Sequence, residues 1–173
     1  MRTLTMSLLL SMLASQAPAA FDVTEPVRDV VEATARNWDE GTTGQVEEVF
    51  SPERLQNRFS KDFAEAFTAA SKNPPHDLPE GETTGFPFDY DPIAQGQDGC
   101  PFKNIRIEDD GDGQVTALFD NRSCFDGTSA ADTVLIFHVV EEAGRAVIDD
   151  IYPVVEGESG ESIKQALKRQ GGL

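Results

Sequence analysis

The sequence predicts an α+β fold in which N-terminal helices pack on an antiparallel sheet and a short helix ends the chain. Three observations support this. Apolar residues recur at helical spacing in the first half of the chain, and they alternate with polar residues in the second half. A loop rich in proline and glycine, residues 73–88, separates the two patterns. Helices first and strands second favour segregated layers around one core.

The first 19 residues are typical of a secretory signal peptide. Arg2 supplies the positive charge, and Met6–Ala14 is a leucine-rich apolar stretch. Ala17-Pro18-Ala19 is a small-residue cleavage site, so we expect cleavage after Ala19, with Ala20 as the alternative. The apolar run is too short to span a bilayer as a mature helix; a retained N-terminal anchor is the alternative interpretation.

The mature chain is expected to be a single domain over residues 20–173, periplasmic or secreted. Removing the signal takes away Arg2 and no acidic residue, which leaves 13 basic against 31 acidic residues and a formal charge of −18. Such a surface repels nucleic-acid phosphates and anionic lipid, so we expect no nucleic-acid partner. No later segment is long and apolar enough to predict a membrane span.

Two helical faces are predicted before the loop. The first begins near Pro26 with Thr24 as its cap, and a further short helical turn is expected at residues 46–50. The second follows Ser51-Pro52, with Ser60 as a second cap midway. We interpret its aromatic ridge as core rather than as a ligand site. The two apolar faces comprise Val27, Val30, Val31, Thr34 and Trp38, then Leu55, Phe59, Phe63, Phe67 and Ala70.

The turn signal Asp110-Gly111-Asp112-Gly113 predicts a first hairpin. If Gly113 takes the left-handed position of a three-residue loop, Ile107 faces Ala117, Ile105 faces Phe119, and Cys100 faces Cys124. Two cysteines after an export signal indicate an oxidising compartment, and only one intramolecular pairing is available. We therefore predict a Cys100–Cys124 disulfide across the open end of the hairpin, with two free thiols as the alternative.

A second hairpin, Thr133–Val140 and Ala146–Tyr152, places His138 near an aspartate. With a two-residue turn at Ala143-Gly144, His138 faces Asp149; with a three-residue turn ending at Gly144, Asp150 is its diagonal neighbour. A carboxylate can orient an imidazole and hold it charged, which suits acid–base chemistry. The alternative is a structural polar pair. A final amphipathic helix is expected from about residue 159 to 169, closed by Gly171.

The element order resembles that of the nuclear transport factor 2-like superfamily, in which a curved sheet wraps a helical layer into a cone. Within it, the chain resembles an exported bacterial domain-of-unknown-function family. The resemblance rests on Phe88-Asp89-Tyr90-Asp91-Pro92, Gln97-Asp98, Val147–Tyr152 and Ser162–Leu167. Ala146 stands where a tryptophan is expected. The resemblance implies a cone-shaped pocket and offers no catalytic residues to carry over.

The remaining candidates are acidic. Asp89, Tyr90, Asp91 and Asp98, with Tyr152, are candidate ligand-binding residues; the alternative is that the aspartates cap local turns. Glu108–Gly113 has some features of a calcium loop, but Phe119 stands where the bidentate glutamate is needed, so we interpret the segment as a hairpin turn. The sequence implies no metal site and no cofactor.

Three functions follow as expectations. The first is a non-enzymatic exported binding or accessory module, holding a small apolar ligand or an envelope protein. The second is a cone-pocket enzyme that uses His138 with Asp149 or Asp150 as acid and base. The third is an inhibitor or immunity-type protein that presents its acidic surface to a basic toxin.

The predicted disulfide can be tested directly by alkylation and intact-mass measurement. Closing a loop of this size contributes roughly 3–4 kcal/mol to the free energy of unfolding by loop-entropy reasoning. The non-reduced exported protein should show no mass increase on alkylation, and the reduced protein should show two additions. Two alkylated thiols without reductant would refute the bridge.

Overall fold

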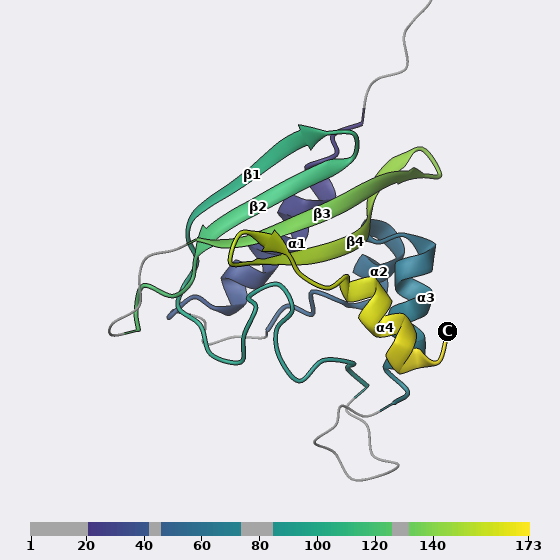
Figure 1. The fold of residues 1–173 in the computed structure, drawn as a ribbon, viewed down its shortest axis with the longest axis horizontal. Coiled ribbons are helices and arrows are strands. Elements are labelled where there is room, and N and C mark those ends of the chain that lie inside the picture. Colours follow the sequence, from purple (N-terminus) through teal and green to yellow (C-terminus); the bar gives the residue numbers. More distant parts are fainter. Residues whose placement is uncertain (1–20, 42–45, 74–84, 126–131) are drawn as a thin grey trace, which may run out of the picture.

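The computed structural model describes residues 21–41, 46–73, 85–125 and 132–173. These ranges contain four helices and an antiparallel sheet of order β1-β2-β3-β4-β5, so the α+β prediction is confirmed (Figure 1). The expected signal peptide lies outside the described residues. In chain order the elements are α1 (Glu25–Asn37), α2 (Pro52–Arg58), α3 (Lys61–Ala70), β1 (Lys103–Gly111), β2 (Gln114–Asp120), β3 (Thr133–Glu142), β4 (Arg145–Val155), β5 (Glu158–Ser159) and α4 (Ile163–Gly171).

The first three helices and one face of the sheet share a core. Figure 1 shows α1 behind the strands and α2 and α3 beside β4, and β4 contacts all four helices. Alternate residues of β2 and β3 point into the core, as their period of two requires. The fully buried core side chains include Val27, Val30 and Val31 of α1, Phe63 of α3, Val115, Ala117 and Phe119 of β2, and Leu135 and Phe137 of β3.

The aromatic ridge is divided between two helices, and both predicted serine caps are present. Ser51 Oγ accepts from the Arg54 N–H at 3.2 Å, and Ser60 Oγ accepts from the Phe63 N–H at 3.1 Å. Between the helices Phe59 is extended. This break lets the Ser60 N–H donate to the Ile148 carbonyl at 2.8 Å, which joins the helical layer to the edge of β4.

The first hairpin has the predicted register but a different turn. Ile107 pairs with Ala117 as expected. The turn is the two residues Asp112-Gly113, both with positive φ, and a register shift before Gly111 restores the pairing. A second irregularity lies between Lys103 and Arg106, where the Ile105–Phe119 pair was expected. There Phe102 stacks on Phe119 instead, with ring centroids 4.2 Å apart.

The predicted disulfide is present. Cys100 and Cys124 are bonded, with their Cα atoms 5.7 Å apart. The Cys100 N–H donates to the Asn121 carbonyl at 2.9 Å, so the bridge lies just beyond the last residues of β2. It closes the open end of the hairpin, and a disulfide is consistent with an oxidising compartment.

The second hairpin follows neither predicted register throughout. Ala143-Gly144 forms the two-residue turn, and Val139 pairs with Ile148 as that turn requires. A bulge at Asp149 then shifts the pairing by one residue, so that His138 pairs with Asp150 rather than with Asp149.

Three smaller predictions were wrong. Residues 46–50 form no helix. The last helix begins at Ile163 because Glu158 and Ser159 pair with the end of β4, and Ser162 is its cap. Gly172, rather than Gly171, takes the left-handed closing position. Gly171 instead permits close helix packing, since a Cβ there would lie 2.7 Å from the Ala69 Cβ of α3.

Substitutions at the positive-φ residues of the two hairpin turns should have opposite effects on the free energy of unfolding. Ala143 has φ of 52° and Asp112 has the same value, but aspartate and asparagine tolerate this conformation better than alanine does. We expect Ala143→Asn to raise the free energy of unfolding by about 1 kcal/mol, and Asp112→Ala to lower it by about the same amount. Urea unfolding measures both, and a destabilised Ala143→Asn variant would contradict the turn assignment.

Candidate functional site

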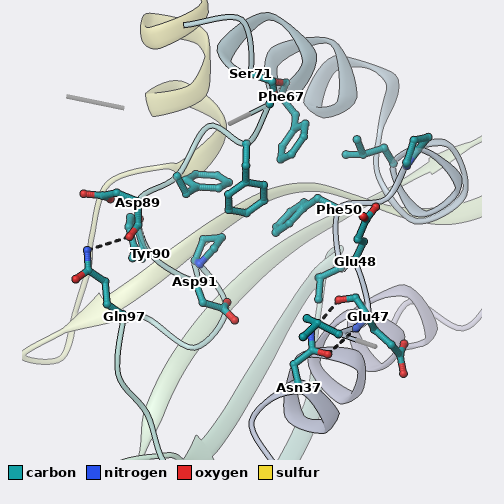
Figure 2. A pocket seen from close by; sticks show the side chains of 18 of the residues that line it. Asn37, Glu47, Glu48, Phe50, Phe67, Ser71, Asp89, Tyr90, Asp91 and Gln97 are labelled. Atoms are coloured by element: carbon teal, nitrogen blue, oxygen red, sulfur yellow. Dashed lines mark hydrogen bonds between the residues drawn. The ribbon is translucent and has the colours of Figure 1, made fainter. Parts of the chain in front are cut away.

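A pocket of about 900 Å³ lies beside the helical layer. Its walls are the end of α1, residues 46–50, α2, α3 and the loop 85–97. Figure 2 shows Asn37, Glu47 and Glu48 on one side, and Asp89, Tyr90, Asp91 and Gln97 on the other. The sheet strands do not line it, so this pocket differs from one enclosed by a curved sheet.

Five rings form an aromatic cluster in the pocket, which we define as Phe50, Phe67, Phe86, Phe88 and Tyr90. Phe50 lies at its centre, with ring centroids 5.2 Å from Phe67 and 5.9 Å from Phe88. Phe50 and Phe67 are buried, whereas Phe86 and Phe88 are only partly buried and therefore present ring surface to the cavity. Such rings offer a large apolar contact area to a ligand.

The wall near α1 is fixed by an amide clamp and an ion-pair cluster. The Asn37 side chain donates to the Glu47 carbonyl at 2.8 Å and accepts from the Glu47 N–H at 2.7 Å. The Glu47 carboxylate accepts from Arg36 and from Arg54. These two guanidinium groups, with Arg36 the stronger, lower the pKa of Glu47 to about 2. The segment after residue 45 is thereby held in place without regular secondary structure.

Asp91 organises the opposite wall. Its Oδ2 accepts from Trp38 Nε1 at 2.9 Å, and its Oδ1 accepts from the N–H groups of Ile93 and Ala94 at 2.9 and 3.0 Å. Gly99 packs against the Trp38 ring so closely that a Cβ would lie 3.0 Å from it. Asp91 therefore both caps its own turn and joins the loop to the end of α1.

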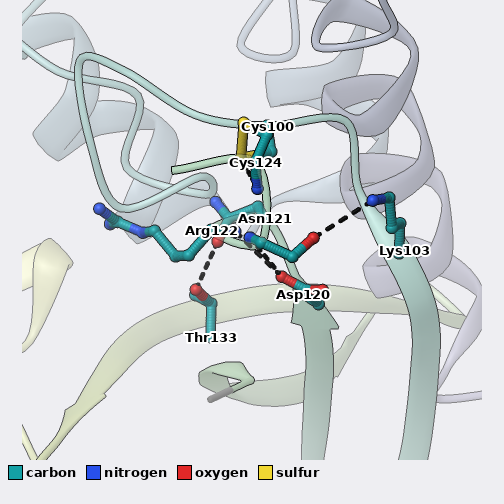
Figure 3. The surroundings of a disulfide bond; sticks show 8 residues. Cys100, Lys103, Asp120, Asn121, Arg122, Cys124 and Thr133 are labelled. Atoms are coloured by element: carbon teal, nitrogen blue, oxygen red, sulfur yellow. Dashed lines mark hydrogen bonds between the residues drawn. A yellow bond between two sulfur atoms is a disulfide. The ribbon is translucent and has the colours of Figure 1, made fainter. Parts of the chain in front are cut away.

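The hairpin end anchors the same loop (Figure 3). Buried Asn121 donates to the Ala94 carbonyl at 2.7 Å and accepts from Thr133 Oγ1 at 2.6 Å. Arg122 donates to the Gln95 carbonyl at 2.6 Å, and the disulfide holds Cys100. These contacts bind residues 91–100 to the sheet, so the pocket wall is built before any ligand arrives.

The acidic stretch from the sequence analysis is only partly brought to the pocket. Asp89, Tyr90 and Asp91 line it, whereas Asp98 is exposed and does not. Asp91 has the turn-capping role of the structural alternative as well as its place in the wall. Burial raises the pKa of Tyr90, with smaller contributions from Asp89 and Glu161, so its hydroxyl stays neutral at neutral pH.

The His138 group lies elsewhere, on the sheet face opposite the helical core. His138 is exposed, and its ring centroid is 4.8 Å from that of Tyr152. Asp150 is its partner in the β-ladder, and burial followed by Asp150 raises the pKa of Tyr152. None of the four candidates His138, Asp149, Asp150 and Tyr152 lines this pocket or the smaller one beside α4. Their catalytic or binding roles stay predictions.

Both aspartates have structural partners. Asp150 is buried and accepts from Ser162 Oγ at 2.5 Å and from the Lys164 N–H at 3.0 Å, at the start of α4. Asp149 accepts from Ser60 Oγ and from Lys164 Nζ, each at 2.8 Å. Within the described residues no hydrogen bond joins His138 to either carboxylate. The two aspartates therefore fasten α4 and α3 to β4.

Other predicted features have plain structural roles. Residues 108–111 end β1 and Asp112-Gly113 form the turn, and Asp110 accepts from Thr116 Oγ1 at 2.5 Å. The part of the chain that the structure describes contains no cluster of three or more metal-ligating side chains, and its helices include none of sufficient length and apolarity to cross a bilayer.

Sequence reasoning missed most of the pocket. The helical spacing of Phe67 and Trp38 predicts core positions, and no sequence pattern marks Phe50, Phe86 or Asn37 as site residues. The available signal was the presence of Phe86 and Phe88 in a loop rich in proline and glycine, where aromatic side chains need an apolar partner.

Comparisons with protein-family models, with curated proteins and with solved structures gave no significant match to this chain.

The Glu47 cluster predicts a pH-dependent contribution to stability. Because the folded pKa lies below the ordinary value of 4.5, the contribution is present above about pH 4.5 and is lost as pH falls through about 2. With its side chain 36% exposed, screening limits the effect to about 0.5–1 kcal/mol. Glu47→Gln should be less stable than the unmodified protein at pH 6, and the difference should shrink as the pH falls towards 2. A difference that persists undiminished at pH 2 would contradict this.

Proposed function

We propose that this protein is an exported, non-enzymatic binding module that holds a small apolar ligand in the pocket beside the helical layer. One observation carries the proposal: a cavity of about 900 Å³ whose lining includes the aromatic cluster. Sites for small molecules typically have roughly this size, 300–1,000 Å³, with mainly apolar walls and a few polar groups.

The rigidity of the walls supports the proposal. The Asn37–Glu47 clamp holds one wall and the Trp38–Asp91 bond the other, and the disulfide ties the second wall to the sheet. A wall that is already ordered loses little conformational entropy when a ligand binds. Such an arrangement favours binding over the mobile lid that many enzymes require.

Export and kinship belong to the same proposal. The N-terminal signal pattern and the disulfide support a periplasmic or secreted location. Three helices followed by an antiparallel meander support membership of the nuclear transport factor 2-like superfamily, although the pocket lies beside the helices and not inside a cone of strands.

The enzyme alternative has less support. A general acid or base must approach the reacting atom of a bound substrate, but His138 lies outside the pocket and both aspartates have structural partners. The inhibitor alternative rests on net charge alone, and no described feature selects a basic protein partner.

Binding of N-phenyl-1-naphthylamine, a neutral probe that fluoresces in apolar sites, tests the proposal. Thr68 is an exposed residue of α3 that lines the pocket, so Thr68→Phe adds a ring at its edge. We expect this change to weaken probe binding about tenfold or more, which corresponds to about 1.4 kcal/mol. The emission of Trp38, the only tryptophan and a lining residue, gives an independent signal for the unmodified protein.

Glu65→Phe is the matched control. It adds the same ring to an exposed position of α3 that does not line the pocket, and should leave probe affinity unchanged. The proposal fails if the probe does not bind to the oxidised protein, or if both variants bind it as the unmodified protein does.

A further inference from the structure

The charged side chains that line the pocket all have the same sign. Glu47, Glu48, Asp89 and Asp91 are lining residues, and the lining within the described ranges includes no lysine, arginine or histidine. The cavity thus combines apolar rings with acidic groups at its borders. Figure 2 shows Glu48 on one side of the labelled phenylalanines and Asp89 and Asp91 on the other.

The four carboxylates differ in the hydrogen-bond and ion-pair partners that they have within the protein. Glu47 is paired with Arg36 and Arg54. Asp91 accepts only from neutral donors, the Trp38 indole and two backbone N–H groups. The carboxylates of Glu48 and Asp89 make no hydrogen bond or ion pair with the rest of the described chain, and both residues are exposed. Three negative charges at the pocket therefore have no cationic partner among the described residues.

An apolar cavity with unpaired carboxylates favours one ligand class over others. A cation near the opening gains attraction to each carboxylate and to the faces of the aromatic rings. An anionic amphiphile, such as a fatty acid, meets repulsion from the same groups and from the net charge of the protein. A neutral ligand gains only the apolar contact.

We propose that the natural ligand carries a positively charged amine or quaternary ammonium group on an apolar body. Glu48, Asp89 and Asp91 face the charged group, and the aromatic cluster contacts the apolar body. This inference rests on the proposed binding function and names the ligand chemistry of the same pocket.

Three probes with the same decyl chain test the inference: decyltrimethylammonium, 1-decanol and decanoate, each below its micelle concentration. Trp38 emission or calorimetry gives the dissociation constants. We expect decyltrimethylammonium to bind about fivefold or more tightly than decanol, and decanoate to bind least tightly. The preference for the cation should fall as salt is raised from 20 to 500 mM, because the carboxylates concerned are exposed to solvent.

A pair of double variants locates the effect. Glu48→Gln/Asp89→Asn should reduce the preference for the cation to about twofold and leave decanol affinity unchanged. Glu141→Gln/Glu158→Gln removes the same number of charges from exposed residues of β3 and β5 outside the pocket, and should keep the preference.

The outcomes separate the two proposals. If decanol binds as tightly as decyltrimethylammonium, the cationic ligand is overturned and the binding pocket stands. Equal losses of preference in both double variants would assign the effect to net charge and overturn the role of Glu48 and Asp89. If none of the three probes binds, the proposed function fails as well.

Discussion

The pocket depends on how an irregular loop is attached to the end of the β1–β2 hairpin. Residues 91–100 contain no helix, yet they form one wall of the cavity. Asn121 holds the Ala94 carbonyl, and the disulfide holds Cys100 a few residues further on. The sheet therefore contributes to the pocket by holding this loop in place through these anchors, and the side chains of its strands do not line the cavity.

The same loop is also held by the helical layer. Asp91 joins it to Trp38 at the end of α1, while the close contact of Gly99 with the indole leaves no room for a larger residue. A loop fixed at both ends can keep a partly apolar cavity open, since its backbone polar groups are already satisfied.

Much of the fold could be predicted because it follows from local periodicity and turn chemistry. Ser51 and Ser60 cap helices as their sequence contexts indicate, and Cys100 and Cys124 meet at the open end of the first hairpin despite the register shift between Lys103 and Arg106. The bulge at Asp149 could not be predicted, because nothing in the local sequence distinguishes it from regular alternation. The pocket could not be predicted either: Trp38, Phe50 and Phe86 come together only through the tertiary anchoring of segments far apart in the chain.

The bulge has a functional consequence for the interpretation of His138. It pairs the histidine with Asp150, whose carboxylate is used at the start of α4. The structure therefore has two candidate functional sites: the aromatic pocket and the exposed sheet face around His138. Titrating the oxidised protein with 1-decanol and following its amide chemical shifts distinguishes directly between the two sites. If the aromatic pocket is the binding site, the shift changes should concentrate at residues 46–55, 67–71 and 85–97. Changes centred on His138 and Tyr152, with those segments unaffected, would show that the pocket is not the site.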